Sequence, residues 1–109
     1  MSRIARVTVP DVPYHITQRG NGRRAVFFTD TDRRTYIRSL GRYAHEHHVQ
    51  VWAYCLMCSH VHLIAVPERP DSLARALGCA HADFARYRNA IDGGCGHVWQ
   101  ARYFSLPAG

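Results

Sequence analysis

Two histidines separated by one residue are the sharpest chemical feature of this sequence. They form the segment His60-Val61-His62, within a stretch whose composition is typical of a β-strand. Side chains two positions apart on a strand point to the same face, so both imidazoles are expected to project together. Imidazole is a common ligand of divalent metals, but two of them need at least one further ligand. The spacing therefore predicts a partial metal site, with ordinary polar surface as the alternative.

Arginine is the second chemical feature. All 14 basic residues are arginine, against 8 acidic residues, which gives a formal net charge of +6 when the 8 histidines are neutral. Guanidinium groups make forked contacts to phosphate and stack on bases, so nucleic acid is the first partner to expect. Three arginines flank a glycine-containing turn and a fourth lies near the C-terminus: Arg19, Arg23, Arg24 and Arg102. As a set they predict phosphate contacts, with a solvated basic surface as the alternative.

Four cysteines offer a competing chemistry. Cys55 and Cys58 form a C-x-x-C motif just before the histidines, so a structural zinc held by two thiolates and one histidine is an alternative. Cys55, however, lies inside an apolar run, which favours a buried small side chain. Cys79 and Cys95 are too far apart to form a second ligand pair. We therefore expect four reduced thiols, as in a cytoplasmic protein.

Strand and helix patterns alternate along the chain and would position these residues. Alternating or β-branched stretches predict strands at residues 14–19, 23–28, 49–57, 60–66 and 97–106. Apolar residues at three- and four-residue spacing predict two amphipathic helices, one after the capping residues 29–32 and one from Ser72 to Gly93. This order predicts an α+β protein with the ferredoxin-like split βαβ arrangement, an antiparallel sheet carrying two helices on one face.

The length and composition limit the class of protein. A chain of 109 residues allows one domain, and 47% apolar with 20% charged residues is typical of a folded protein. Apolar runs such as Leu63 to Val66 are far shorter than the roughly 20 residues needed to span a bilayer. Residues 1–13 contain no apolar export segment. We expect one cytoplasmic domain with no membrane partner.

Five blocks of the sequence together resemble the HUH single-tyrosine transposases, especially those associated with repetitive extragenic palindromes. The central block, residues 53–64, contains the histidine pair and resembles the HUH segment itself. The other blocks follow the family's order: residues 12–21 with 26–28, Asp32 with Tyr36 and Leu40, residues 84–89, and the Gly-x-x-Trp-Gln-x-Arg segment beginning at Gly96.

The resemblance implies a transposase that acts on single-stranded DNA and recognises hairpins formed by palindromic ends. It implies that His60 and His62 hold Mg²⁺ or Mn²⁺ against the scissile phosphate while a tyrosine hydroxyl attacks and forms a 5′-phosphotyrosine. It also implies a homodimer, and it makes Arg19, Arg23, Arg24 and Arg102 candidate DNA contacts. The alternatives are a catalytically inactive remnant that only binds DNA hairpins and, from fold analogy alone, an RNA-binding sheet.

The nucleophile is the place where this sequence departs from the family. Family members carry the tyrosine on a further helix, in a Tyr-x-x-x-Asn-Pro segment, whereas this chain stops at Gly109. Tyr87 and Tyr103 are the internal candidates by position, but packing or stacking explains such aromatic residues better. We therefore identify no catalytic residue, and we expect residues 1–109 to form one HUH domain without the helix that carries the nucleophile.

Overall fold

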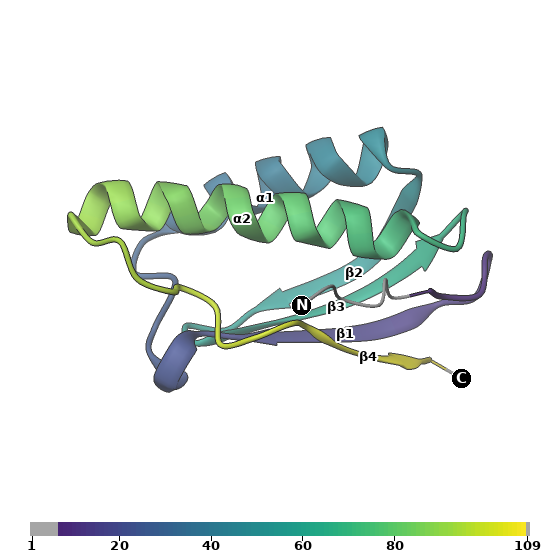
Figure 1. Ribbon diagram of the computed structural model, residues 1–109, viewed down its shortest axis with the longest axis horizontal. Coiled ribbons are helices and arrows are strands. Elements are labelled where there is room, and N and C mark those ends of the chain that lie inside the picture. The colour runs from purple at the N-terminus through teal and green to yellow at the C-terminus, as the bar shows by residue number, and fades with distance from the viewer. Residues whose placement is uncertain (1–6, 109) are drawn as a thin grey trace, which may run out of the picture.

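A four-stranded antiparallel sheet with both helices on one side forms this protein (Figure 1). The computed structural model describes residues 7–108. The elements in chain order are β1 (Tyr14–Arg19), a 3-10 turn η1 (Asn21–Arg23), α1 (Asp30–Glu46), β2 (Val49–Leu56), β3 (His60–Pro67), α2 (Ser72–Asp92) and β4 (Phe104–Pro107). The strand order is β2-β3-β1-β4. The predicted α+β fold of the ferredoxin-like split βαβ class is confirmed.

The two central strands separate a core face from a face that no helix covers. Ile16 in β1 is fully buried, and Val61 and Leu63 in β3 are each 1% exposed. The residues between them, among them His15 and His62, are exposed or half-buried. Because side chains alternate along a strand, the buried residues face the helices and the others face away. We call the second side the helix-free face.

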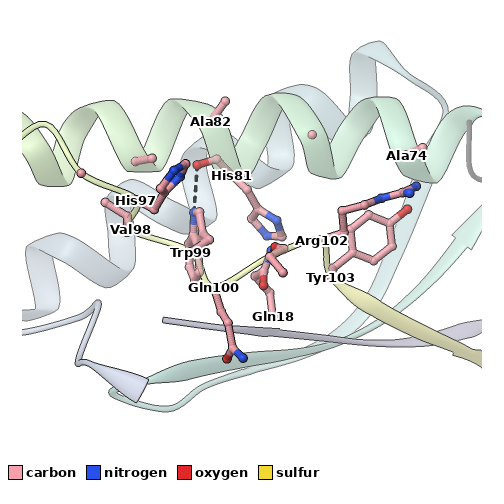
Figure 2. A pocket seen from close by; sticks show the side chains of 14 residues that line it. Gln18, Ala74, His81, Ala82, His97, Val98, Trp99, Gln100, Arg102 and Tyr103 are labelled. Carbon is pink, nitrogen blue, oxygen red and sulfur yellow. Dashed lines mark hydrogen bonds between the residues drawn. The ribbon is translucent and has the colours of Figure 1, made fainter. Parts of the chain in front are cut away.

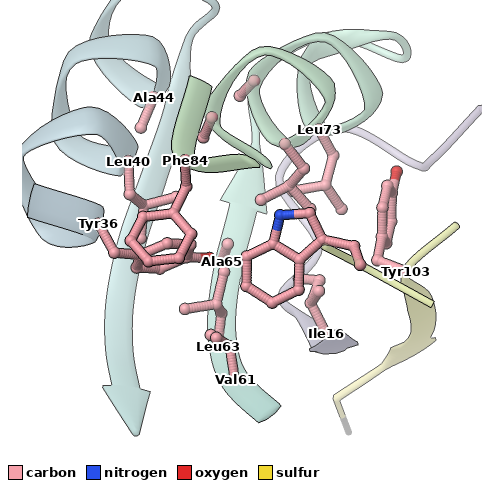
Figure 3. Close-up of a cluster of buried hydrophobic side chains, with 14 of the residues drawn as sticks. Ile16, Tyr36, Leu40, Ala44, Val61, Leu63, Ala65, Leu73, Phe84 and Tyr103 are labelled. Carbon is pink, nitrogen blue, oxygen red and sulfur yellow. The ribbon is translucent and has the colours of Figure 1, made fainter. Parts of the chain in front are cut away.

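Aromatic side chains fill the core between the sheet and the helices (Figure 3). Tyr36 of α1 and Phe84 of α2 pack edge to face with ring centroids 5.7 Å apart, and Trp99 lies 5.8 Å from Phe84. The indole nitrogen of Trp99 donates to the backbone carbonyl of His81 at 2.9 Å. This bond fastens the segment before β4 beneath α2.

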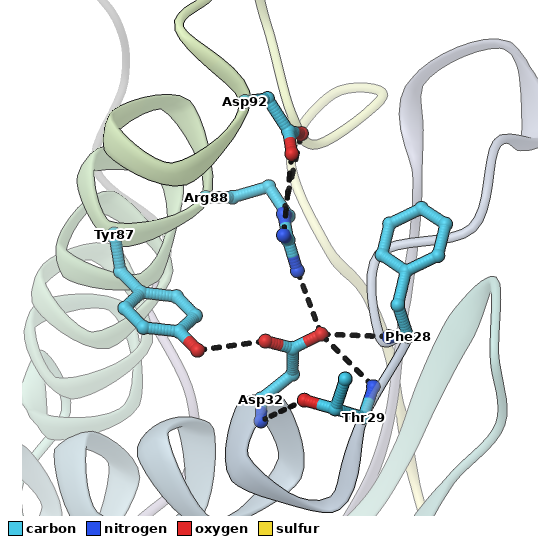
Figure 4. A network of polar contacts seen from close by, with 6 residues as sticks. All are labelled: Phe28, Thr29, Asp32, Tyr87, Arg88 and Asp92. Atoms are coloured by element: carbon cyan, nitrogen blue, oxygen red, sulfur yellow. Dashed lines mark hydrogen bonds and ion pairs between the residues drawn. The ribbon is translucent and has the colours of Figure 1, made fainter.

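The start of α1 is tied to the end of α2 by one carboxylate (Figure 4). Thr29 and Asp32 form a capping box, each side chain accepting the other residue's backbone amide at 3.1 Å. Asp32 also accepts hydrogen bonds of 2.7 Å from the Tyr87 hydroxyl and from the Arg88 guanidinium. Burial alone would raise the pKa of Asp32, but these hydrogen bonds outweigh burial and hold its pKa well below the ordinary range.

The predicted strand at residues 23–28 is wrong. The backbone amides of Val26 and Phe27 both donate to the carbonyl of Cys58, at 2.7 and 3.2 Å, so they join no strand ladder. Both side chains are 2% exposed and belong to the core. Val26 and Phe27, the apolar residues that suggested a strand, therefore belong to a loop that covers one end of the core.

The predicted last strand is shorter than residues 97–106. Only Phe104–Pro107 pairs with β1 as a strand, and before it Trp99 forms an isolated bridge with Gly20. The hairpin predicted from residues 49–57 and 60–66 is confirmed, as are both helices.

Among residues 7–108, neither helix is long and apolar enough to cross a membrane. The predicted absence of an export signal rests partly on residues 1–6, which lie outside the described residues.

Candidate functional site

Strand β3 places His60 and His62 together on the helix-free face, as their spacing predicts. Both are half-buried, and Val61 between them points into the core. The two ring centroids are 4.9 Å apart. Each ring has a partner at Nδ1: the Oγ of Ser59 lies 3.2 Å from His60 Nδ1, and the Nε2 of His15 lies 3.1 Å from His62 Nδ1.

Strand β1 adds two polar side chains that the sequence analysis missed, His15 and Thr17. Thr17 is the cross-strand partner of His62, and its Oγ1 lies 3.4 Å from His62 Nδ1. The rings of His15 and His62 stack with centroids 5.3 Å apart. Burial, together with the positive charges of His60, His15 and Arg19, lowers the pKa of His62, so the ring is neutral near pH 7. The two-residue spacing of His15 and Thr17 is the signal that could have found them.

A cavity of about 510 Å³ opens beside the histidine pair. Its lining comes from five residues: Arg19, Arg23, Ser59, His60 and Gln100. Arg19 is the cross-strand neighbour of His60, and the backbone amide of Gln100 donates to the carbonyl of Arg19 at 2.9 Å. Two exposed guanidinium groups beside an imidazole form a positively charged wall that suits a phosphate. Gln100 also lines the cavity, although the sequence identified it only as part of the Gly-x-x-Trp-Gln-x-Arg segment.

The turn after β1 carries Arg23 to this cavity. The backbone amide of Gly20 donates to the carbonyl of Ser59 at 2.8 Å, and its carbonyl accepts from the amide of Arg23 at 3.0 Å. A Cβ at Gly20 would collide with the carbonyl oxygen of Arg24, so only glycine permits this close approach. The turn is thus held against the loop that leads into β3.

Arg24 and Arg102 do not line the cavity that contains His60. Arg102 lines a smaller cavity, of about 160 Å³, together with Thr17 and Arg19. The guanidinium of Arg24 donates to two backbone carbonyls of neighbouring loops, each at 3.2 Å. Arg102 lines a groove of about 690 Å³ between α2 and the segment before β4 (Figure 2). In the same view the side chain of Gln100 points away from α2. Two of the four predicted arginines therefore line the cavity with His60, and Arg102 lines the neighbouring cavity with Thr17. Arg24 lies elsewhere.

Comparison with known proteins agrees with this geometry. Residues 8–109 match the family of IS200-like transposases. The chain belongs to this family. The resemblance seen in the five sequence blocks is therefore confirmed at the level of the family.

Two solved structures share the fold. One is a REP-associated tyrosine transposase bound to a REP hairpin, with a TM-score of 0.73 and 18% identity over 99% of this chain. This chain spans 62% of the length of that protein. The other is a candidate transposase from Deinococcus radiodurans, with a TM-score of 0.70, 17% identity, and coverage of 99% of this chain and 87% of the other. At such identities the likeness shows the fold. No curated protein matches the chain.

The histidine pair of this IS200-like domain fits part of a metal site. Because each Nδ1 has a hydrogen-bond partner, the Nε2 atoms of His60 and His62 are the ones left for ligation. Within residues 7–108, no three His, Cys, Asp or Glu side chains are grouped as a complete metal site. Two imidazoles would therefore hold a divalent cation together with water, amide or phosphate oxygens.

Zinc held by cysteines gains no support from the arrangement. All four cysteines are free thiols, as predicted. Cys55 and Cys58 are both exposed, so the prediction that Cys55 is buried is wrong. The reason is that β2 lies at the edge of the sheet, and most of its side chains are open to solvent.

None of the six tyrosines, all of which the structure describes, lines the cavity beside the histidine pair. The hydroxyl of Tyr87 donates to Asp32, and this hydrogen bond raises the pKa of Tyr87 (Figure 4). Tyr103 is 7% exposed and packs in the core (Figure 3). Neither tyrosine is placed to attack a phosphate held at His60.

Proposed function

We propose that this domain binds single-stranded DNA containing a hairpin and holds one phosphodiester of it at the histidine pair, as a step of DNA transposition. The observation that carries this proposal is the cavity that joins His60 to Arg19 and Arg23 on the helix-free face. Membership of the IS200-like transposases supports it. So does a relative of the same fold that is bound to a REP hairpin.

Each residue of the cavity has a part in this proposal. Arg19 and Arg23 bind the phosphate oxygens and fix the strand across the end of β1. His60 and His62 hold Mg²⁺ or Mn²⁺ through Nε2. When bound, the cation neutralises charge on a phosphoryl oxygen. Gln100 offers an uncharged hydrogen-bonding group in the same cavity.

The attacking hydroxyl comes from outside residues 1–109 in this proposal. The tyrosines of the chain lie elsewhere in the fold, and the family carries its nucleophile on a separate helix. Residues 1–109 then act as one HUH domain that supplies phosphate binding. A homodimer in the cytoplasm is the state that the resemblance implies, and a relative that carries the tyrosine helix can supply the hydroxyl in trans.

Binding of a labelled hairpin-containing single strand tests the site. We expect Arg19→Ala with Arg23→Ala to weaken binding, measured by fluorescence anisotropy in Mn²⁺, by at least about tenfold. The matched control is Arg42→Ala with Arg75→Ala, because both are exposed arginines that already pair with an acidic neighbour. An equal loss of affinity in the two double variants would show non-specific charge attraction and overturn the proposal.

A remnant that binds DNA without taking part in cleavage is the second candidate, because the tyrosines lie away from the cavity. The discriminating experiment mixes this chain with a full-length family member whose own histidine pair is replaced by alanine. A covalent protein–DNA band on a denaturing gel, lost when His60→Ala is introduced here, supports the proposed function. Hairpin binding without such a band favours the remnant.

A further inference from the structure

A second basic groove lies beside the edge strand β2 and is separate from the cavity described above. Its volume is about 560 Å³. Six residues of α1 and β2 line it: Arg33, Arg34, Ile37, Arg38, Tyr54 and Leu56. Three of these are arginines and none is acidic. None of them belongs to the histidine site.

The arginines of this groove make no ion pair with the acidic side chains that the structure describes. In the part of the chain that the structure describes, the ion pairs made by arginine involve Arg42, Arg75, Arg86 and Arg88. Arg34 and Arg38 are exposed and lie one helical turn apart. Like charges at this spacing repel and slightly destabilise a helix, so stability of α1 does not account for them. A bound polyanion would account for these neighbouring arginines.

The floor of the groove is apolar and presents one aromatic ring. Tyr54 is the cross-strand partner of Leu63, which places it on the helix-covered face of the sheet. It is nevertheless 56% exposed, because β2 is an edge strand. Ile37 and Leu56 beside it are half-buried. An exposed ring among guanidinium groups suits single-stranded nucleic acid, whose bases stack on aromatic rings while its phosphates pair with arginine.

The groove and the histidine pair lie on opposite faces of the β2–β3 hairpin. Cys55 follows Tyr54 in β2 and is the cross-strand partner of His62. Successive side chains of a strand point to opposite faces, and neighbouring strands are only about 4.8 Å apart. A DNA strand that leaves His62 therefore has to cross β2 alone to reach Tyr54.

We infer that this groove binds the unpaired flank of the DNA whose phosphate lies at the histidine pair. A base of the flank stacks on Tyr54, and its phosphates pair with Arg34 and Arg38. Arg33 also lines the groove, where its guanidinium lies over the Phe27 ring. The inference rests on the proposed function, because it assumes DNA at His62. The exposed ring and the short path across β2 favour a nucleic acid over an acidic protein segment.

Two oligonucleotides separate the groove from the histidine site: one hairpin with a flank of twelve thymidines and the same hairpin without the flank. We expect Arg34→Ala with Arg38→Ala to weaken binding of the flanked hairpin about tenfold. The slope of log affinity against log salt should fall in magnitude by about 1.4, which is two phosphate contacts at about 0.7 each for single strands. Binding of the unflanked hairpin should not change.

The aromatic ring has its own test with the flanked hairpin. Tyr54→Ala is expected to weaken binding about five- to hundredfold through loss of one stacked base. Tyr54→Phe keeps the ring and should bind like the natural chain. The control for charge is again Arg42→Ala with Arg75→Ala, which should leave both oligonucleotides unaffected.

The outcomes distinguish failure of the proposed function from failure of the groove inference alone. Failure of the natural chain to bind either hairpin overturns the proposed function and this inference with it. Normal binding of the unflanked hairpin, with no gain from the flank and no effect of the groove variants, overturns the inference alone. Polyglutamate that binds more tightly than a twelve-residue thymidine strand, and loses that binding in Arg34→Ala with Arg38→Ala, would assign the groove to an acidic protein and also overturn it.

Discussion

The Nδ1 atom of His62 has two polar neighbours on β1, His15 Nε2 at 3.1 Å and Thr17 Oγ1 at 3.4 Å. If Nδ1 carries the hydrogen and donates it to either neighbour, the lone pair of the ring is on Nε2, where a metal can use it. Ser59 orients His60 in the same manner. Metal binding at this pair should therefore depend on residues that do not touch the metal.

His15→Ala tests this dependence. Removal of the acceptor leaves His62 free to rotate and to change tautomer, so we expect Mn²⁺ affinity to fall about 10- to 100-fold. Isothermal titration calorimetry measures the affinity directly, without DNA. His45→Ala is the matched control, because His45 is an exposed histidine on α1. Unchanged Mn²⁺ binding in His15→Ala, together with its loss in His62→Ala, would contradict the orienting role.

Asp32→Asn tests the carboxylate that joins the two helices. The Arg88 guanidinium, whose side chain is 8% exposed, would lose the negative charge of its buried partner at 2.7 Å. We expect the free energy of unfolding to fall by about 3–5 kcal/mol. Asp92→Asn removes the other partner of Arg88, which is 53% exposed, and should cost about 1 kcal/mol or less. Urea denaturation followed by circular dichroism would compare them, and equal losses would contradict the assignment.

At the scale of elements, local periodicity accounts for most of the fold. The helices and the β2–β3 hairpin follow from apolar spacing, and the capping residues 29–32 mark the start of α1 correctly. The strand prediction for residues 23–28 is wrong because Val26 and Phe27 are buried in the core as part of a loop and do not pair with a strand. Spacing along the chain does not distinguish these two causes.

The candidate site also has one part that local spacing predicts and another part that it does not. The spacing of His60 and His62 alone predicts a shared face, since that is a property of a single strand. Their contact with His15 depends on the register between β1 and β3, which a single sequence does not specify. Cys55 was expected to be buried because it lies in an apolar run, but it is exposed on the edge strand β2. The edge position of a strand is likewise a property of the whole sheet.

The buried contact between α1 and α2 at His81 predicts a dependence of stability on pH. His81 lies 2.8 Å from the Tyr36 hydroxyl, and burial lowers the pKa of His81 to about 3. In the unfolded chain the pKa is about 6.5, so between these values the unfolded state binds a proton that the folded state does not. Stability should therefore fall as the pH drops below about 6.5, by up to about 1.4 kcal/mol per pH unit.

Thermal unfolding between pH 7 and about pH 5.5 measures this effect above the range where most carboxylates titrate. His81→Gln removes the titrating ring, so its melting temperature should be lower at pH 7 but should vary less with pH. A variant that keeps the full pH slope of the natural chain would show that another group is responsible.

At the scale of the whole molecule, two groups of arginines lie on opposite sides of the sheet. The cavity with Arg19 and Arg23 opens on the helix-free face, and the groove with Arg34 and Arg38 lies on the helix-covered side of β2. In the two proposals above, these four of the 14 arginines form two separate sets of phosphate contacts. Such an arrangement makes binding depend strongly on salt, because each phosphate that is neutralised releases counterions.

The slope of log affinity against log salt for hairpin binding therefore measures the number of these phosphate contacts. In EDTA, log affinity should fall linearly with log salt, and Arg19→Ala with Arg23→Ala should reduce the magnitude of the slope by about 1.4 to 1.8. His62→Ala should leave the slope in EDTA unchanged, because the lowered pKa of His62 keeps the ring neutral near pH 7. Fluorescence anisotropy from 50 to about 300 mM salt gives both slopes. If His62→Ala reduces the slope as much as the arginine variant does, the histidine pair contacts phosphate as a charged group, and its assignment as a metal-binding pair is wrong.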